Sequence, residues 1–382
     1  MDLQLDAEQQ ELRDETRTWL AANVPSEPFA PPSTAQGLEQ HREWERKLFD
    51  AGLAAVHWPR EYGGRGMDAL STAIFYDEYL SAKAPDRLNR LGLGLAGPTI
   101  IELGNDLQKK RWLSNILSCE EIWCQGFSEP DAGSDLASLR TRGEVNGDTI
   151  VVNGQKIWTS HSRFADWIFA LVRTDPSAPK HRGITFLMID RHAPGVDVRP
   201  IKQMNHSADF AELFFTEVVV PRENVIGEIN GGWKVAMTTL KHERGSSLNT
   251  AGHFHRSLTE MIKLVPVERR EDAAVRQQIG RFYEEIEAYR FMTLRTLSAI
   301  SQGREPGPQG AMGKLWWSEM QVRLYEFGLA MLGERAELRD TSTPAPLVQR
   351  YWLGRAAQIY AGSNEIQRNI IAERVLGLPR GS

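Results

Sequence analysis

Residues 124–135 read Cys-Gln-Gly-Phe-Ser-Glu-Pro-Asp-Ala-Gly-Ser-Asp, and residues 155–160 read Gln-Lys-Ile-Trp-Thr-Ser. The first segment is a polar, glycine-containing loop, and the second is a strand that ends in an aromatic and two hydroxyl side chains. The small residues of the loop allow backbone N–H groups to approach phosphate oxygens closely. Trp158 can cover one face of a planar ring. Together the two segments predict a site for the pyrophosphate and the ring of a flavin.

Three further segments extend this pattern along the chain. They read Trp58-Pro-Arg-Glu-Tyr-Gly-Gly64, Gly104-Asn-Asp-Leu-Gln-Lys-Lys110, and Gly362-Ser-Asn-Glu-Ile-Gln-Arg368 with Gly377-Leu-Pro-Arg380. With the loop and the strand, they resemble the acyl-CoA dehydrogenase family, whose usual wording is Thr-Glu-Pro-x-Ala-Gly-Ser-Asp followed by Lys-x-Trp-x-Thr/Ser. The resemblance implies FAD as the cofactor, an acyl-CoA thioester as the substrate, and an electron-transferring flavoprotein as the electron acceptor. The implied reaction is α,β-dehydrogenation: flavin N5 takes a hydride from the β-carbon, while the protein removes the α-proton and polarises the thioester carbonyl.

The resemblance also implies which residues contact the cofactor. The resemblance gives Ser134 two roles, one beside the phosphates of the cofactor and one in binding the substrate. The full cofactor set comprises Phe127, Ser128, Gly133, Ser134, Trp158, Thr159, Ser160, Ser363 and Glu365.

The catalytic base departs from the commonest family pattern. Many members carry a Glu immediately before the Gly of the carboxyl-terminal motif, but this chain has Ala361 before Gly362. Ala361 cannot take a proton, although its backbone N–H can still polarise the thioester oxygen, as the resemblance implies. The base must therefore come from another position.

A second family arrangement, found in relatives of the isovaleryl-CoA and long-chain branch, places the base as a Glu just before an Arg on a helix. Leu240-Lys-His-Glu-Arg244 offers that pair. Trp233, Ala236 and Leu240 follow a helical spacing, and Glu243 is the next position of that predicted apolar face. The resemblance gives Arg244 a role in holding CoA. The alternative for Glu243 is a solvated carboxylate in a charged cluster.

Other candidate bases remain open. Glu365 lies four residues beyond Ala361, but the resemblance places it in the turn that contacts the flavin. Glu129 is expected to anchor the loop, and His242 and His206 are expected to be structural.

Composition bounds the class of protein. The chain has 382 residues and a formal charge of −5, with no long basic run that would favour nucleic acid or an anionic membrane as a partner. Its two cysteines, Cys119 and Cys124, form neither a disulfide framework nor a metal-ligand pattern, which favours a reducing compartment such as the cytoplasm. The amino terminus has the features of neither a signal nor a transit peptide, and no run of eighteen apolar residues predicts a membrane span.

Periodicity predicts three domains, and the resemblance implies that they form the α+β fold of the acyl-CoA dehydrogenase type. Residues 1–123 are predicted to be helical, residues 124–230 to form a β domain, and residues 231–382 to form an antiparallel, four-helix-type bundle. Asp6 with Gln9 predicts a capping box at the first helix. Predicted helices cover 6–22, 38–53, 233–264, 271–302, 308–333, 344–358 and 363–374; predicted strands cover 167–172, 183–189 and 213–220; and predicted hairpin turns cover 145–148 and 152–155.

The oligomeric state is left open between two arrangements. Many relatives receive an Arg-x-x-Phe-Gly segment and a Gln-x-x-Gly-Gly segment from a neighbouring subunit, and the corresponding regions here, 265–272 and 330–334, lack both. Similar gaps occur among actinobacterial relatives that act on steroid or other bulky thioesters, in which two different chains share a flavin site. The chain is thus expected to form a homodimer or homotetramer, or a heterotetramer with a related subunit.

Three functions follow from these features. The first is an acyl-CoA dehydrogenase with Glu243 as the base. The second is a half-catalytic subunit of a heteromeric enzyme, favoured by Ala361 and the missing segments. The third is a flavin oxidase or monooxygenase on the same scaffold.

Overall fold

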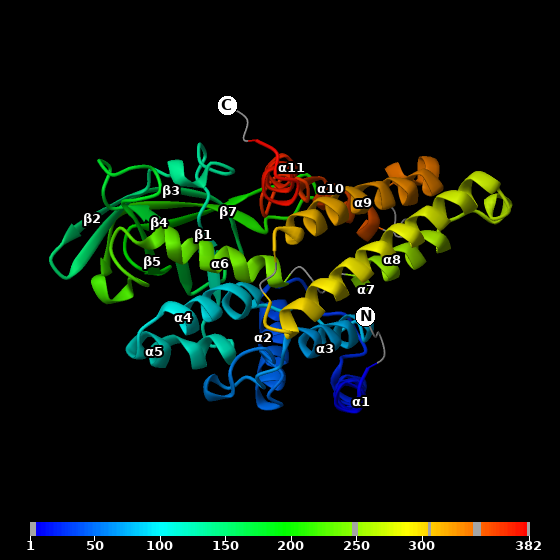
Figure 1. The fold of residues 1–382 in the computed structure, drawn as a ribbon, viewed down its shortest axis with the longest axis horizontal. Coiled ribbons are helices and arrows are strands. Elements are labelled where there is room, and N and C mark those ends of the chain that lie inside the picture. Colours follow the sequence, from blue (N-terminus) through cyan, green and yellow to red (C-terminus); the bar gives the residue numbers. More distant parts are fainter. Residues whose placement is uncertain (1–4, 247–250, 305–306, 339–344, 380–382) are drawn as a thin grey trace. The chain divides into compact units, whose positions relative to one another are not determined.

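Contacts divide the chain into two units, and Figure 1 labels their helices and strands. The computed structural model describes residues 5–246, 251–304, 307–338 and 345–379, with the side chains of 243–246, 309, 345 and 346 outside the described part. The sheet unit comprises 25–67 and 85–246, and the bundle unit comprises 1–24, 68–84 and 247–382. The predicted domain boundaries, 1–123, 124–230 and 231–382, remain a prediction.

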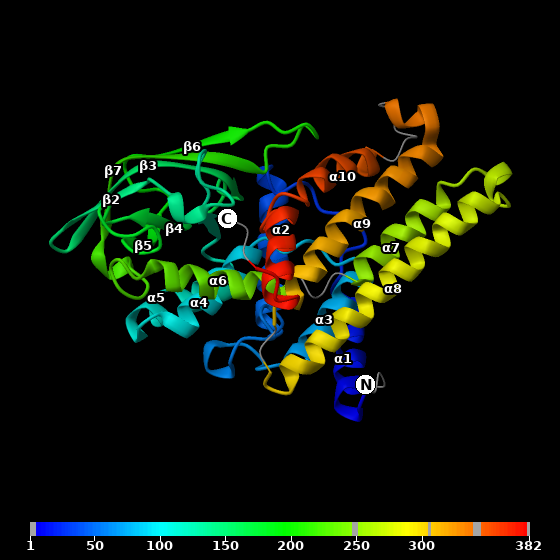
Figure 2. The ribbon, with the colours of Figure 1, turned by 45° about the horizontal axis from the view of Figure 1, so that its top comes forward.

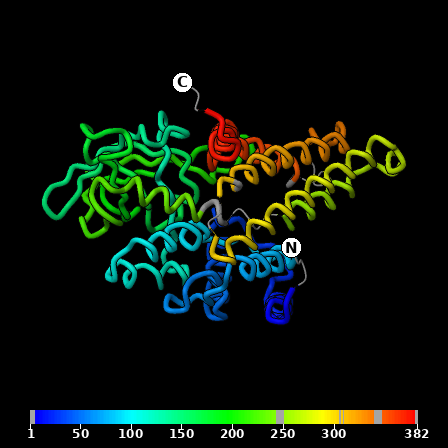
Figure 3. The backbone as a smooth tube through the Cα atoms, viewed as in Figure 1, coloured from blue at the N-terminus to red at the C-terminus, as the bar shows by residue number. Residues whose placement is uncertain are grey.

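A seven-stranded sheet forms the centre of the sheet unit. The strand order is β1-β4-β2-β3-β7-β6, and β5 pairs with β4. The strands are β1 (Trp123–Gly126), β2 (Arg142–Asn146), β3 (Thr149–Ser160), β4 (Trp167–Arg173), β5 (Ile184–Asp190), β6 (Val196–Ile201) and β7 (Phe210–Pro221). They come from one continuous part of the chain, as the colours of the tube in Figure 3 show.

Burial explains why these segments form strands. β4 and β5 are apolar runs whose side chains are almost all buried, whereas alternate residues of β3 and β7 are buried, which is typical of a sheet with one covered face. The core includes Ile150, Ile168, Leu187 and Leu213, all 0% exposed. The three predicted strands are confirmed as β4, β5 and β7; β1 and β6 were not predicted.

The two predicted hairpin turns have different outcomes. The turn at 145–148 is confirmed, because β2 and β3 pair from Asn146–Thr149 onward, with Gly147 at φ +58°. The turn at 152–155 is wrong, because β3 continues through it with a register shift against β7 between Val152 and Gly154. The side-chain amide of Asn153 donates to Glu217 Oε1 (2.6 Å), and Glu217 N donates to Asn153 Oδ1 (2.9 Å). These hydrogen bonds to β7, which is distant in sequence, pair the polar groups at the irregularity, so the chain does not need to reverse there.

Helices pack on the sheet within the same unit. They are α2 (Ala35–Asp50), α4 (Gly97–Leu103), α5 (Asp106–Leu117) and α6 (Gly232–Ser246), with a π-helical turn, η2 (Gly92–Ala96), directly before α4. α6 lies alongside the sheet, with α4 beside it, in both ribbon views (Figures 1 and 2). Short 3-10 helices complete the unit at η1 (Arg60–Tyr62), η3 (Leu136–Ser138) and η4 (Arg222–Asn224).

All regular elements among the described residues of the bundle unit are helices. Its long helices α7, α8 and α9 run side by side (Figure 2) around a core that includes Phe254, Phe282, Ile286 and Leu324. The helices are α1 (Ala7–Asn23), α3 (Ala69–Ser81), α7 (Ala251–Lys263), α8 (Ala273–Ser301), α9 (Gln309–Leu332), α10 (Ala345–Ala356) and α11 (Asn364–Ile370), with η6 (Val267–Arg269), η7 (Gly333–Glu337) and the π-helical η8 (Ile371–Val375).

Most helix predictions agree with the structure to within a few residues. The capping box at α1 is confirmed, with Gln9 N donating to Asp6 Oδ1 (2.8 Å) and Asp6 N to Gln9 Oε1 (3.2 Å). The predicted helix over 233–264 corresponds to α6 and α7, and residues 247–250 between them lie outside the described residues. In the described part of the chain, no helix combines the length and hydropathy needed to cross a bilayer.

Candidate active site

The loop that follows β1 is a tight, exposed turn. Glu129 N donates to Ala132 O and Ala132 N donates to Glu129 O, both at 3.0 Å. Gly133 and Ser134, which come next, are exposed, and a side chain placed at Gly133 would meet no atom within 4 Å. The backbone at this point is therefore open to a ligand, as an anion-binding loop requires.

A buried ion pair holds the base of the loop. Lys156 is 0% exposed, and its Nζ donates to Glu129 Oε1 (2.7 Å) and to Phe127 O (3.2 Å). Glu129 also accepts from Arg140 N (2.6 Å) and Thr141 N (2.9 Å). Lys156 thereby binds Phe127 and Glu129 at the start of the loop, and Glu129 joins that start to residues 140 and 141 at its end. The prediction that Glu129 anchors the loop is confirmed.

The electrostatics of this pair follow from its burial. Burial lowers the pKa of Lys156 to about 8, against the attraction of Glu129. Burial acts to raise the pKa of Glu129, but Lys156 and the hydrogen bonds outweigh it and lower that pKa. Both groups are therefore charged at neutral pH. Lys156 stands in the motif at 155–160, but no local pattern indicates that its side chain is buried.

The end of β3 presents an aromatic ring beside an unsatisfied hydroxyl. Trp158 is 57% exposed at φ +60°, within a register shift between Lys156 and Thr159, and its ring meets Phe210 edge-on at 6.1 Å between centroids. Thr159 is 0% exposed, and its Oγ1 has no hydrogen-bond partner among the described residues. An orphaned buried hydroxyl next to an exposed ring fits a planar ligand that carries polar edge atoms.

The remaining predicted flavin residues of the sheet unit lie on the same two segments. Phe127 is buried and meets Phe169 and Phe186 edge-on, so its side chain belongs to the core. Ser128 is half-buried, and its carbonyl accepts from Ile157 N (2.9 Å), which joins the loop to β3. Ser160 is half-buried at the end of β3.

An arginine–histidine contact adjoins this strand and was not predicted. Arg90 Nε donates to His161 Nε2 at 3.3 Å, directly after Ser160. Burial, and then the charge of Arg90, lower the pKa of His161 to about 4. A neutral acceptor thus holds a guanidinium near the end of β3. The motifs gave no signal for Arg90, which lies 71 residues from its partner.

The carboxyl-terminal residues of the predicted site lie in the bundle unit. Ala361 is exposed at φ +54°, and Gly362 follows at φ +82°. Ser363 caps α11 by accepting from Ile366 N at 3.4 Å. Glu365 is exposed, with an oxygen 4.0 Å from Arg368 Nη1. Two consecutive left-handed residues before a capped helix hold the turn in one specific conformation.

Asn364 fixes this turn to α9 and was not predicted as a site residue. It is 3% exposed, and its Oδ1 accepts from Lys314 Nζ (2.9 Å) and Ser318 Oγ (3.0 Å). Burial lowers the pKa of Lys314 to about 8, against the attraction of Glu365 and Glu319. Asn364 therefore determines where Ala361 and Glu365 lie relative to α9.

The predicted apolar face of α6 needs correction. The buried positions are Val235, Ala236 and Thr239, whereas Trp233 and Leu240 are only half-buried. Position 243 is seven residues after Ala236 and four after Thr239, so it continues the observed face in helical register. The side chains of Glu243 and Arg244 lie outside the described part, and their roles stay predictions.

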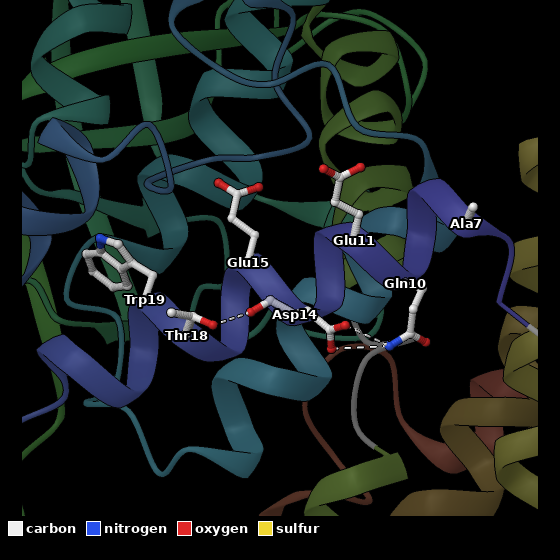
Figure 4. Close-up of a pocket in the computed structure, with 7 residues that line it drawn as sticks. All are labelled: Ala7, Gln10, Glu11, Asp14, Glu15, Thr18 and Trp19. Atoms are coloured by element: carbon white, nitrogen blue, oxygen red, sulfur yellow. Dashed lines mark hydrogen bonds between the residues drawn. The ribbon is translucent and has the colours of Figure 1, made fainter.

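A shallow depression along α1 offers no comparable chemistry. Figure 4 shows its lining side chains, which all come from this helix, and the amide of Gln10 donates to the carboxylate of Asp14 (3.1 Å to Oδ2). Glu11 and Glu15 extend to one side of the same helix. The depression contains only groups from one exposed helical surface, which does not build a binding site.

Comparison with known proteins identifies the family. The N-terminal, middle and C-terminal domain models of acyl-CoA dehydrogenases match residues 6–120, 124–218 and 230–376. Acyl-CoA dehydrogenase IpdE1 of Mycobacterium tuberculosis is 40% identical over 381 residues, covering 97% of this chain and 98% of that protein. The chain belongs to the acyl-CoA dehydrogenase family. It is an acyl-CoA dehydrogenase of the FAD-dependent type, as its motifs predicted.

Solved structures agree with this assignment. A structure described as the Tcur3481-Tcur3483 steroid ACAD has a TM-score of 0.87 at 30% identity and covers 100% of both chains. The ChsE4-ChsE5 complex from Mycobacterium tuberculosis has a TM-score of 0.84 at 31% identity, again with 100% of both chains covered. The predicted fold class is confirmed, with an N-terminal helical domain, a middle β domain and a C-terminal helical domain.

Proposed function

We propose that Glu243 removes the α-proton of an acyl-CoA thioester, while the backbone N–H of Ala361 donates to the thioester oxygen. The observation that supports Glu243 is the buried face of α6, which continues in register to position 243. We infer that a carboxylate that continues this buried face loses part of its hydration, and desolvation raises the pKa of a carboxylate and makes it a stronger base. Ala361 supplies no competing carboxylate.

Two observations support a fit between these residues and FAD: the unpaired buried hydroxyl of Thr159 and the open backbone at Gly133. When bound, FAD accepts the β-hydrogen as a hydride at N5. We assign the phosphates to the backbone near Gly133 and Ser134, and the ring to Trp158 with the unsatisfied hydroxyl of Thr159. Phe127, Ser128, Ser160, Ser363 and Glu365 complete the proposed contacts. Arg244 is proposed to hold the CoA moiety, and Ser134 to lie beside the substrate as well.

The partner and the acyl group are proposed from the names of similar structures. Two of them are named as pairs of chains, and one of these is called a steroid ACAD. Together with the missing cross-subunit segments, this supports a heteromer with a related subunit and a bulky, polycyclic acyl group. An electron-transferring flavoprotein is the proposed acceptor. Two free, buried cysteines support a reducing compartment, and we propose the cytoplasm.

We expect the chain purified alone to carry less than one FAD per chain, because a second subunit completes the flavin site in the proposed heteromer. Absorbance spectra give the flavin-to-protein ratio, and light scattering gives the mass of the assembly. Co-expression with a related subunit should raise the ratio. A homotetramer of this chain with full FAD occupancy would contradict the heteromer and support a homo-oligomer.

We expect Ser134→Asp to weaken FAD binding about thirtyfold, or on the order of 2 kcal/mol, because it sets a carboxylate against the pyrophosphate. Fluorescence titration of the apoprotein with FAD measures the affinity. Ser26→Asp makes the same change at another exposed serine of the sheet unit and should leave it unchanged. Equal affinities for the two variants would show that the loop does not hold the phosphates.

A further inference from the structure

Arg90 follows a buried residue that fixes its backbone in the sheet unit. Asn89 is 0% exposed, and its amide donates to Ile116 O and to Glu121 O, both at 2.9 Å. Its Oδ1 accepts from Trp123 N at 3.0 Å. These hydrogen bonds join the segment to parts of the chain that are 27 or more residues away. Arg90 itself is exposed, so a fixed backbone carries an accessible guanidinium.

The partner of Arg90 is uncharged. Arg90 Nε donates to His161 Nε2 at 3.3 Å. Burial, and then the charge of Arg90, lower the pKa of His161 to about 4, while the carboxylate of Asp209 acts in the opposite direction, so the ring is neutral at neutral pH. In the described part of the chain, no carboxylate forms an ion pair with Arg90. The ring therefore orients the guanidinium without neutralising it, and further N–H groups of Arg90 can donate to an oxygen acceptor.

Gly94 leaves an open position near Arg90. It lies in the π-helical turn η2, between Leu93 and Leu95, which are each 4% exposed. Gly94 is only half-buried, and a side chain placed there would meet no atom within 4 Å. The chain is helical from Arg90 onward, and a separation of four residues puts positions 90 and 94 on the same side of a helix. A cation and an open space therefore share one side of this segment, and π-helical turns are frequent at functional sites.

The contact to His161 relates this segment to the proposed flavin site. His161 directly follows Ser160 at the end of β3, where Trp158 and Ser160 are proposed to bind the flavin ring. The β-carbon of the substrate must reach flavin N5 for hydride transfer, so the acyl group has to lie beside the ring. A side chain that adjoins the ring site is thus within reach of the acyl group.

We propose that Arg90 donates to an oxygen of the acyl group that is remote from the thioester, and that the open position at Gly94 accommodates the bulk of that group. The substrate class is then a thioester of a bulky acid that carries a carbonyl or carboxylate oxygen on its acyl part, because a guanidinium without a carboxylate partner gains most from such an acceptor. This inference rests on the proposed function and adds to it the polarity of the acyl group.

Matched thioesters test the role of Arg90. The probes are cyclohexylpropanoyl-CoA and its derivatives with a carbonyl or a carboxylate on the ring. The parent should prefer the best oxygen-bearing derivative over the unsubstituted thioester by about tenfold or more in kcat/KM, and in Arg90→Gln this preference should fall to less than about twofold, because a hydrogen bond from a charged donor is lost. Arg163→Gln removes another exposed guanidinium of the same unit and should keep the preference. An equal preference in the parent and Arg90→Gln, or none in the parent, would overturn the proposal.

A second substitution tests the space at Gly94. Gly94→Leu should lower the ratio of kcat/KM for cyclohexylpropanoyl-CoA to that for butanoyl-CoA about tenfold, because it fills the open position. Gly94→Ala adds one methyl group and should shift the ratio less, in the same direction. Gly280→Leu makes the larger change at an exposed glycine of α8 that also faces open space, and should leave the ratio unchanged. A parent-like ratio in folded Gly94→Leu would overturn this part of the proposal.

Binding without turnover separates this inference from the proposed function. Thioether analogues of the same probes lack the thioester carbonyl and cannot be dehydrogenated, and calorimetry with the FAD-loaded protein gives their affinities. Arg90→Gln should lose the preference for the oxygen-bearing thioether even if the parent reduces its FAD with none of the thioesters, a result that would reject the dehydrogenase reaction alone. Weaker FAD binding by Arg90→Gln with an unchanged preference among the thioethers would overturn the inference and assign Arg90 to the cofactor.

Discussion

Glu243→Gln should slow reduction of the bound FAD by roughly a hundredfold to ten-thousandfold, the range typical of a lost general base. Gln keeps the shape and the hydrogen-bonding capacity of Glu but cannot accept the α-proton. Substrate binding should change little, because the interaction that is lost occurs only in the transition state. Anaerobic stopped-flow absorbance, with a good thioester substrate, measures the rate at which the flavin is bleached.

Two further variants test whether the catalytic base is Glu243 or another carboxylate. Glu365→Gln should bind FAD more weakly, because Glu365 is a proposed cofactor contact, but the FAD that it holds should be reduced at close to the parent rate, because the base at position 243 is intact. Ala361→Glu in the Glu243→Gln background should restore part of the rate, since it puts a carboxylate where many relatives carry their base. Bleaching of Glu243→Gln at the parent rate, with slow bleaching of Glu365→Gln, would move the base to Glu365.

The family, the fold class and the cofactor could be read from the sequence because they depend on short local motifs. The loop at 128–135 and the strand at 156–160 each carry their function in consecutive residues, and both lie in one unit of the structure. Apolar runs such as 167–172 predict buried strands for the same reason. In these cases local pattern and tertiary structure agree.

Other features depend on partners that are distant in sequence. The Asn-Gly pair at 153–154 has the same composition as the true turn at 146–147, but β7 pairs through it, and Glu217 bonds to Asn153. The face of α6 is set by its neighbours, which bury Thr239 and leave Leu240 half-buried. No local signal distinguishes these outcomes, because the deciding contacts span 64 residues or more.

Burial of Lys156 is the clearest feature that depends on residues distant in sequence. Replacing this lysine is expected to have the second large effect. Lys156→Met should lower the free energy of unfolding by about 3–5 kcal/mol, because it leaves the Glu129 carboxylate buried without its cation. FAD affinity should also fall, since Phe127 and Glu129 lose the group that fixes the loop. Chemical denaturation of the apoprotein measures the first effect, and FAD titration measures the second.

Lys180→Met is the matched control, because Lys180 pairs with Asp135 in the same loop but both side chains are at least half exposed. An exposed pair contributes at most about 1 kcal/mol, so this variant should stay close to the parent in stability. The double variant Glu129→Gln with Lys156→Met should recover much of the loss, since no buried charge is left unpaired. Equal losses for Lys156→Met and Lys180→Met would contradict a buried, desolvated pair.

The pH dependence of stability is an independent test of the pair formed by Lys156 and Glu129. The folded-state pKa of Glu129 is lowered from 4.5, so its stabilisation is present above about pH 4.5 and is lost as the pH falls through the folded value. In Lys156→Met, burial acts without the opposing cation, and the pKa of Glu129 should rise. The variant then takes up its proton at a higher pH than the parent, and the stability difference between them should shrink steadily as the solution is acidified. A difference that stays constant from neutral pH to pH 4 would mean that the carboxylate of Glu129 does not depend on Lys156, and that packing of the lysine stem alone accounts for the loss.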